Sequence, residues 1–100
     1  MNVVMISGRI AWIGDARSAG KSTVIDFGVI HSIKIREKNH KTHVTCQMWG
    51  AQIQNFLKYK KKGDYIVVKG ALRTNEYEKD GRRRSECYVH VEQLDYGPKR

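Results

Sequence analysis

The sequence predicts an all-β fold: a small five-stranded antiparallel barrel with one short helix between its third and fourth strands. Three observations lead to this prediction. Runs rich in Val, Ile and Tyr alternate in polarity along most of the chain. Glycines lie inside several of these runs, as expected where long strands must bend. One central stretch has helical periodicity instead. A chain of 100 residues accommodates one domain and excludes a two-domain enzyme.

Five segments are predicted as strands, and they cover residues 2–10, 23–31, 43–49, 65–77 and 85–94. A further run over residues 32–38 alternates isoleucine with Lys34, Arg36 and Lys38. This period of two predicts a projecting β-ribbon with one charged face. An Asp80-Gly81 pair predicts the turn between the last two strands.

Residues 50–63 predict the helix, because Ile53, Phe56 and Leu57 have the spacing of one helical face. Four lysines follow near the carboxyl end, where cations complement the helix dipole, and Gly63 supplies a stop. Three strands, a helix and two strands, with glycines at the bends, are typical of the oligonucleotide/oligosaccharide-binding barrel, or OB-fold. An SH3-like barrel is the main competitor, but it normally lacks a helix of this length at that place.

Composition favours a polyanionic partner. Lys and Arg outnumber Asp and Glu by 19 to 10, which gives a net charge of +9. No run approaches the roughly 18 apolar residues of a membrane span, and residues 1–5 do not resemble a secretion leader. We therefore expect a protein with no membrane association, located in the cytoplasm. Cys46 and Cys87 are too few for a disulfide framework and are predicted as reduced core thiols.

No catalytic, metal or cofactor site is legible. Residues 14–22 end in Gly-Lys-Ser, but the spacing has one residue too many for a phosphate loop and a strand follows instead of a helix. A hairpin loop is the favoured interpretation, with Arg17 and Lys21 as possible contacts to phosphates. His40 and His43 lack the partners that a zinc site needs. We therefore expect a protein that is not an enzyme.

Aromatic side chains on polar strand faces are the informative feature. In residues 43–49, Trp49 shares its side with His43 and lies opposite the apolar set that includes Cys46. Tyr77 shares parity with Arg73 in the following strand. Exposed rings beside cations suit unpaired bases, which stack on them while Lys and Arg hold the phosphates. Packing at a rim or a subunit contact is the alternative role for Trp49 and Tyr77. Trp12 and Tyr88 are weaker candidates for stacking.

Cations of two predicted loops flank the same sheet face. Lys34, Arg36 and Lys38 belong to the ribbon, and Arg82, Arg83 and Arg84 follow the Asp80-Gly81 turn. Each run alone is equally typical of a solvated loop. Their position on both sides of the aromatic residues favours phosphate binding. The predicted DNA-binding set is Trp49, Tyr77, His43, Lys34, Arg36, Arg73, Arg82, Arg83 and Arg84.

Several segments resemble the bacterial single-stranded DNA-binding protein family. They are residues 2–10, His-Val-Thr-Cys-Gln-Met-Trp-Gly at 43–50, 56–63, Gly-Ala-Leu-Arg-Thr at 70–74, and 86–94. The resemblance implies an OB-fold domain over residues 1–96 that coats single-stranded DNA during replication, recombination and repair. It also implies association with the nucleoid and a homo-oligomer, with a tetramer favoured and a dimer possible. Trp49 falls at a stacking aromatic of the family, and Tyr77 at a position that is typically tryptophan.

Departures from the family pattern leave alternatives open. His43 replaces a family tryptophan and Ile35 stands near another, so cationic contacts would contribute more. The family ordinarily appends an acidic recruitment tail, whereas residues 97–100 form a short basic tail. A phage or plasmid type, a relative of primosomal replication protein N, or an RNA-binding OB module therefore stays possible. A nuclease would need a set of metal-binding carboxylates that the sequence does not show.

Overall fold

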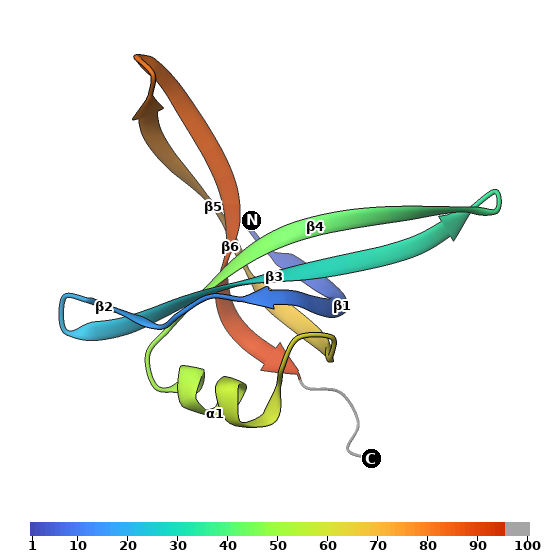
Figure 1. Ribbon diagram of the computed structural model, residues 1–100, viewed down its shortest axis with the longest axis horizontal. Helices are drawn as coiled ribbons and strands as arrows, with labels where there is room; N and C mark the ends of the chain where they lie inside the picture. The colour runs from blue at the N-terminus through green and yellow to red at the C-terminus, as the bar shows by residue number, and fades with distance from the viewer. Residues whose placement is uncertain (96–100) are drawn as a thin grey trace.

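The computed structural model describes residues 1–95 as a closed β-barrel from which two long hairpins project (Figure 1). The predicted tail, residues 97–100, lies outside the described residues. The elements, in chain order, are β1 (Val4–Ile13), β2 (Arg17–Ala19), β3 (Ser22–Ile35), β4 (Lys38–Trp49), α1 (Gln52–Tyr59), β5 (Tyr65–Lys79) and β6 (Arg82–Asp95).

Five strands close the barrel in the order β1-β5-β6-β4-β3, and a second pairing of β1 with β3 completes the ring. The short β2, which was not predicted, pairs only with β3 and forms the hairpin expected around residues 14–22. Each pairing is antiparallel except β4 with β6, which is parallel at Cys46–Val89 and Gln47–His90. The purely antiparallel barrel was therefore wrong in this detail. In a ring of five strands, directions cannot alternate all the way round, so one pairing must be parallel.

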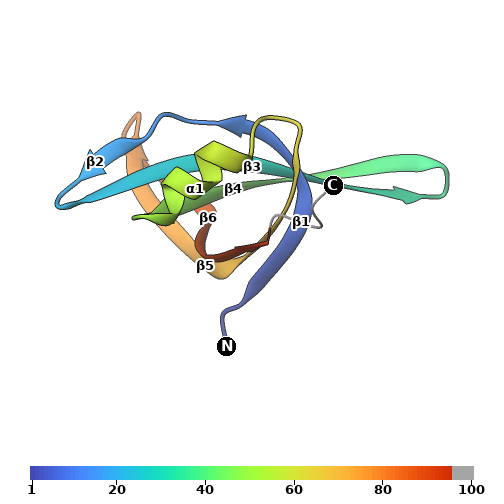
Figure 2. The same ribbon diagram turned by 90° about the horizontal axis from the view of Figure 1, so that it is seen from below.

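The core fills the inside of the barrel and is sealed at one end by α1 (Figure 2). Phe56 of α1 packs against Phe27 of β3 with ring centroids 4.7 Å apart, and Ile53 is also buried. Leu57, predicted for the same face, is 46 % exposed. The helix is shorter than predicted: it ends at Tyr59, and Lys60 already has an extended backbone. Three of the four lysines therefore follow the helix instead of belonging to its last turn.

Hairpins β3–β4 and β5–β6 extend beyond the barrel (Figure 1). The predicted ribbon 32–38 is the end of β3, a two-residue turn, and the first residue of β4. Arg36 and Glu37 form this turn with φ values of 50° and 66°. Positive φ at both central residues matches the twist of the flanking strands. Asp80 and Gly81 form the equivalent turn of β5–β6, as predicted, with φ values of 54° and 73°.

The two thiols differ. Cys46 is buried inside the barrel, and burial raises the pKa of its thiol to about 12. Cys87, also predicted as a core residue, is exposed. Its neighbours of the same parity, Val89 and Val91, are buried within the barrel, but Cys87 lies closer to the hairpin turn and is open to solvent. Within residues 1–95, no helix has the length and apolar character needed to cross a bilayer.

Candidate nucleic-acid interface

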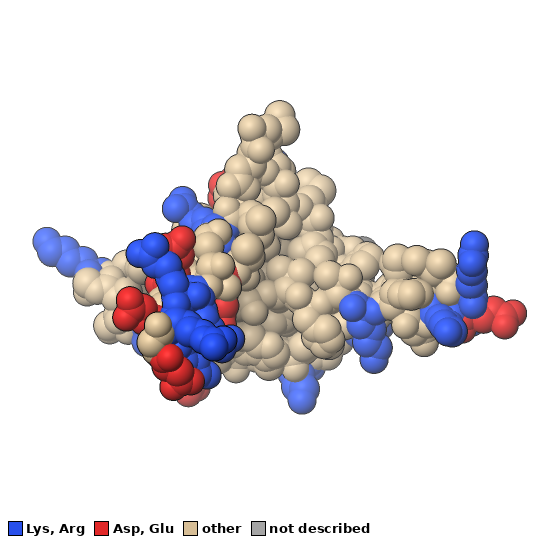
Figure 3. Space-filling view, turned by 90° about the horizontal axis from the view of Figure 1, so that it is seen from above, with Lys and Arg blue, Asp and Glu red and all other residues tan. Residues whose placement is uncertain are grey.

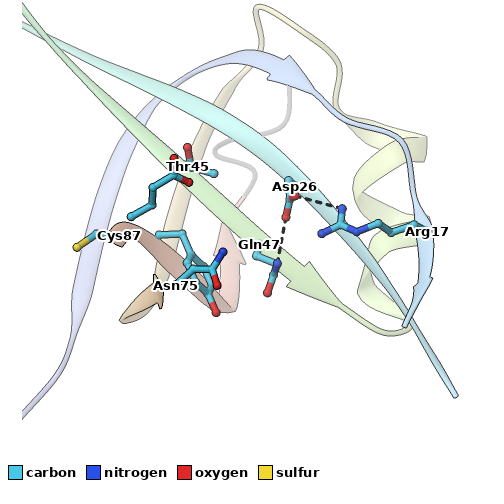
Figure 4. A pocket seen from close by; sticks show the side chains of 8 residues that line it. Arg17, Asp26, Thr45, Gln47, Asn75 and Cys87 are labelled. Carbon is cyan, nitrogen blue, oxygen red and sulfur yellow. Dashed lines mark hydrogen bonds and ion pairs between the residues drawn. The ribbon is translucent and has the colours of Figure 1, made fainter. Parts of the chain in front are cut away.

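A polar groove of about 530 Å³ lies between the β3–β4 sheet and the base of the β5–β6 hairpin (Figure 4). Its walls come from segments far apart in the sequence that the closed barrel brings together. The lining residues are Arg17, Asp26, Thr45, Gln47, Asn75, Glu86, Cys87 and Tyr88. The groove is open to solvent and is not an enclosed cavity.

A chain of polar contacts crosses one wall of the groove and ends on Trp49. The Arg17 guanidinium pairs with Asp26 Oδ2 at 3.1 Å, and Gln47 Nε2 donates to Asp26 Oδ1 at 3.2 Å (Figure 4). The indole N–H of Trp49 in turn donates to Gln47 Oε1 at 3.0 Å. Because Asp26 and Gln47 are cross-strand partners in β3 and β4, strand register fixes this arrangement. The contacts hold the indole at the groove edge.

Trp49 lies on the surface, as its strand parity predicts. It is the last residue of β4 and 37 % exposed, while Cys46 and Met48 on the other face are fully buried. Its cross-strand partner Val24 is buried but lies outside the main core cluster. The indole therefore occupies an apolar spot on the outer face of the barrel and keeps surface available for a ligand.

Tyr77 lies on the hairpin above the groove and is half-buried. Its hydroxyl donates to Glu86 Oε1 at 2.9 Å, and this hydrogen bond to the Glu86 carboxylate is the first cause that raises the pKa of Tyr77. Tyr77 pairs with Arg84 across the hairpin, and Asn75 pairs with Glu86. Strand alternation places these four residues on one face of the hairpin, the face that borders the groove.

His43 and Trp12 lie on the same outer face, beyond Thr45. His43 is exposed and pairs with Ile30, two positions along β3 from the Gly28–Thr45 pair. Trp12 of β1, 44 % exposed, lies over Gly28. Trp12 was a weaker candidate in the sequence. The pairing of β1 with β3 places its indole one strand away from the groove wall.

The predicted cations lie on the two hairpins and not inside the groove. Figure 3 shows Lys and Arg gathered over the β5–β6 hairpin, together with acidic residues, and spaced along the β3–β4 hairpin. Lys34 and Arg36 are at the far end of the latter. Arg73 pairs with Tyr88 at the groove. All of the predicted basic residues are exposed.

The three consecutive arginines do not share one face. Arg84 pairs with Tyr77 and Arg83 pairs with Glu78, so alternation along β6 turns Arg83 away from Tyr77.

The groove residues Asp26, Gln47 and Glu86 were not predicted from the sequence. Their polar positions in strands were visible, but nothing in the sequence showed that β3, β4 and β6 meet there. Arg17, a possible phosphate contact, is paired with Asp26.

Comparisons with known proteins agree with this geometry. The sequence model of the Single-strand binding protein family matches residues 1–96. Among solved structures, a Plasmodium falciparum SSB in complex with single-stranded DNA is similar, with a TM-score of 0.82 and 18 % identity, covering 95 % of this chain and 91 % of that chain. No curated protein is similar in sequence to this chain. The OB-fold barrel is thereby confirmed, and the chain belongs to the Single-strand binding protein family.

Proposed function

We propose that the protein coats single-stranded DNA of any sequence in replication, recombination and repair. The observation that carries the proposal is the exposed indole of Trp49, held by Gln47 at the edge of an open groove between two basic hairpins. Bases stack on Trp49 and Tyr77, and less strongly on His43. Each stacked base contributes about 1–3 kcal/mol, whatever its identity, because every base has an aromatic face.

Phosphates follow the cationic hairpins. Lys34 and Arg36 on one side, and Arg73 with Arg82–Arg84 on the other, supply exposed charge around the groove. Each phosphate that they neutralise releases counterions and contributes about −0.7 to the slope of log affinity against log salt. Affinity therefore decreases steeply as salt is raised. With few tryptophans in the site, this electrostatic contribution is a large part of the binding free energy.

The test is a titration of oligo-dT against tryptophan emission in a Trp12→Phe background, where Trp49 is the remaining tryptophan. Emission is quenched as the strand binds. In the wild-type background, Trp49→Ala lowers affinity by about tenfold or more. The matched control is Tyr59→Ala, which removes an exposed aromatic residue from α1, outside the groove. If Trp49→Ala binds as tightly as the control, the stacking proposal is wrong. Tighter binding of a matched RNA strand would favour an RNA-binding function instead.

We also propose that the chain assembles as a homo-oligomer, a tetramer in preference to a dimer. Residues 4–6 of β1 pair with β5 but not with β3, so one edge of this segment is open within the described residues. Met1, Val3 and Met5 are exposed beside it. A second copy would cover this edge and the apolar side chains. Light scattering measures the state: a tetramer is expected, a dimer would point to the primosomal type, and a monomer would refute the assembly.

A further inference from the structure

Trp12 presents one face of its indole to solvent at a fixed position. The side chain is 44 % exposed, although its ring lies against the protein. A Cβ built on Gly28 would lie 2.6 Å from Cε2 and 2.7 Å from Cδ1 of the indole, with Nε1 between them closer still. This position is above the ring plane and not beside its edge. The ring face toward Gly28 is therefore covered, and the exposed surface belongs to the opposite face and the ring edge.

The indole of Trp12 borders the groove wall. Trp12 belongs to β1, and its ring reaches over Gly28 of β3, whose cross-strand partner in β4 is Thr45. Thr45 lines the groove, and so does Asp26, the next residue of β3 on the same face as Gly28. The outer surface of the sheet therefore continues from the groove residues onto the open face of Trp12.

Trp49 and Trp12 lie at different points along this surface. In β4, residues 45, 47 and 49 alternate onto one face, and Trp49 is four residues from Thr45. Four residues of a strand span about 13 Å, several times the spacing of about 3.4 Å between stacked bases. The two indoles are therefore platforms for different bases, and Gln47 and Thr45 lie between them.

Positive charge continues the same face beyond Trp12. By strand register, Lys41 of β4 and Lys34 of β3 follow Thr45 and Gly28 on the outer face of the β3–β4 hairpin. Both lysines are exposed, and neither forms an ion pair within residues 1–95. Residues 31–43 contain four Lys or Arg and one Glu. The phosphates of a strand that leaves Trp12 in this direction therefore meet a cationic hairpin.

We propose that Trp12 is a second base-stacking platform, and that a bound strand runs from Trp49 over Thr45 to Trp12 and on toward Lys41. The inference rests on the proposed function. Contact of one ring face with Gly28 holds the indole in place, so a base stacks on the other face without first ordering the side chain. Every base has an aromatic face, so the platform accepts any sequence. If Trp12 only covered the strand backbone, its aromatic character would not matter for DNA affinity.

Fluorescence tests the contact directly, because the chain contains two tryptophans. In a Trp49→Phe background, Trp12 is the remaining tryptophan. Oligo-dT of about 12 nucleotides, a length within the range that one OB-fold covers, should quench its emission as the strand binds. Binding is followed separately by the fluorescence anisotropy of a dye on the DNA. Trp12 emission that stays unchanged while the strand binds overturns the inference.

Substitutions separate stacking from packing. Trp12→Leu keeps an apolar side chain over Gly28 but removes the aromatic face, and it should lower affinity for the same strand about five- to tenfold. Trp12→Phe keeps an aromatic face and should bind within about twofold of the wild type. The matched control is Tyr59→Leu, which removes an exposed aromatic residue from α1 outside the groove and should leave affinity unchanged. Denaturant unfolding verifies that each variant is folded under the binding conditions.

The results distinguish this inference from the proposed function. If Trp12→Leu binds as tightly as the wild type while Trp49→Ala loses affinity, Trp12 is a packing residue and the proposed function stands. If Trp12→Leu and Trp12→Phe lose affinity equally, the aromatic face is not what the strand uses, and the inference is again overturned. If the wild-type protein does not bind oligo-dT, the proposed function itself fails.

Discussion

Trp12 covers the α-carbon of Gly28. A Cβ built on Gly28 would overlap Nε1, Cε2 and Cδ1 of the indole, three consecutive atoms of its five-membered ring. The flat side of the indole thus rests on the backbone of β3, and its other side faces away from it. Gly28 and Trp12 are also cross-strand partners, at the place where the register of β1 and β3 shifts. The glycine is required here for close approach, not for an unusual backbone angle.

Gly28→Ala should therefore lower the free energy of unfolding by about 1–3 kcal/mol, because the added methyl displaces the indole. Denaturant unfolding measures this change. In the double variant Gly28→Ala/Trp12→Ala there is no indole for the added methyl to overlap. The loss of unfolding free energy in the double variant should therefore be smaller than the sum of the losses in the two single variants. Strict additivity would contradict a direct contact between the two residues.

Arg84 and Arg83 provide a test of strand alternation in DNA binding. They are consecutive and exposed, but only Arg84 shares the face of Tyr77. Arg84→Ala should reduce the salt slope of oligo-dT binding by about 0.7, the contribution of one phosphate. Arg83→Ala removes the same charge and should change the slope less. Equal losses from both variants would show that the hairpin acts as a charge cluster without a preferred face.

The two cysteines should differ in reactivity. At neutral pH, a thiol reagent should modify one thiol of the native protein, Cys87, and two after denaturation, because Cys46 is buried. A Cys87→Ser variant should show no fast-reacting thiol when folded. Rapid labelling of that variant would mean that the barrel opens readily around Cys46.

Burial of Cys46 also predicts a loss of stability at high pH. Its pKa is raised from 9.0 in the unfolded chain to about 12 in the fold. Below pH 9 the thiol is protonated in both states; above it the unfolded state loses the proton first, and stability decreases by about 1.4 kcal/mol per pH unit until pH 12. Unfolding curves of wild type and Cys46→Ala should diverge in this interval. If the free energies of unfolding of the two proteins changed with pH in parallel, the raised pKa of Cys46 would be contradicted.

The neighbours Phe56 and Leu57 test how α1 seals the barrel. Phe56 is fully buried against Phe27, whereas Leu57 is 46 % exposed. Phe56→Ala should lower the free energy of unfolding by about 3–5 kcal/mol. Leu57→Ala should change it by about 0.5 kcal/mol or less. Comparable losses would mean that Leu57 is covered in solution, for example by a second copy of the chain.

Apart from the short β2, the order of the elements can be predicted from the sequence, as can the inward face of the central strand and of the helix and the aromatic side chains that stay outside. Alternation around Cys46 and Met48 decides which side of the strand is buried, and so places Trp49 on the surface. The spacing of Ile53 and Phe56 likewise determines the face of the helix that enters the core. These features depend on residues near one another in the chain, so a local pattern is enough to predict them.

Which polar residues meet depends on the tertiary structure. Asp26, Gln47 and Glu86 belong to three strands, and the parallel pairing of β4 with β6, which a ring of five strands requires, brings them to one groove. The exposure of Cys87 and the opposite faces of Arg83 and Arg84 depend on where β5–β6 leaves the barrel and on its register. Local pattern specifies which face of a strand is apolar, but closure of the sheet determines what lies opposite it.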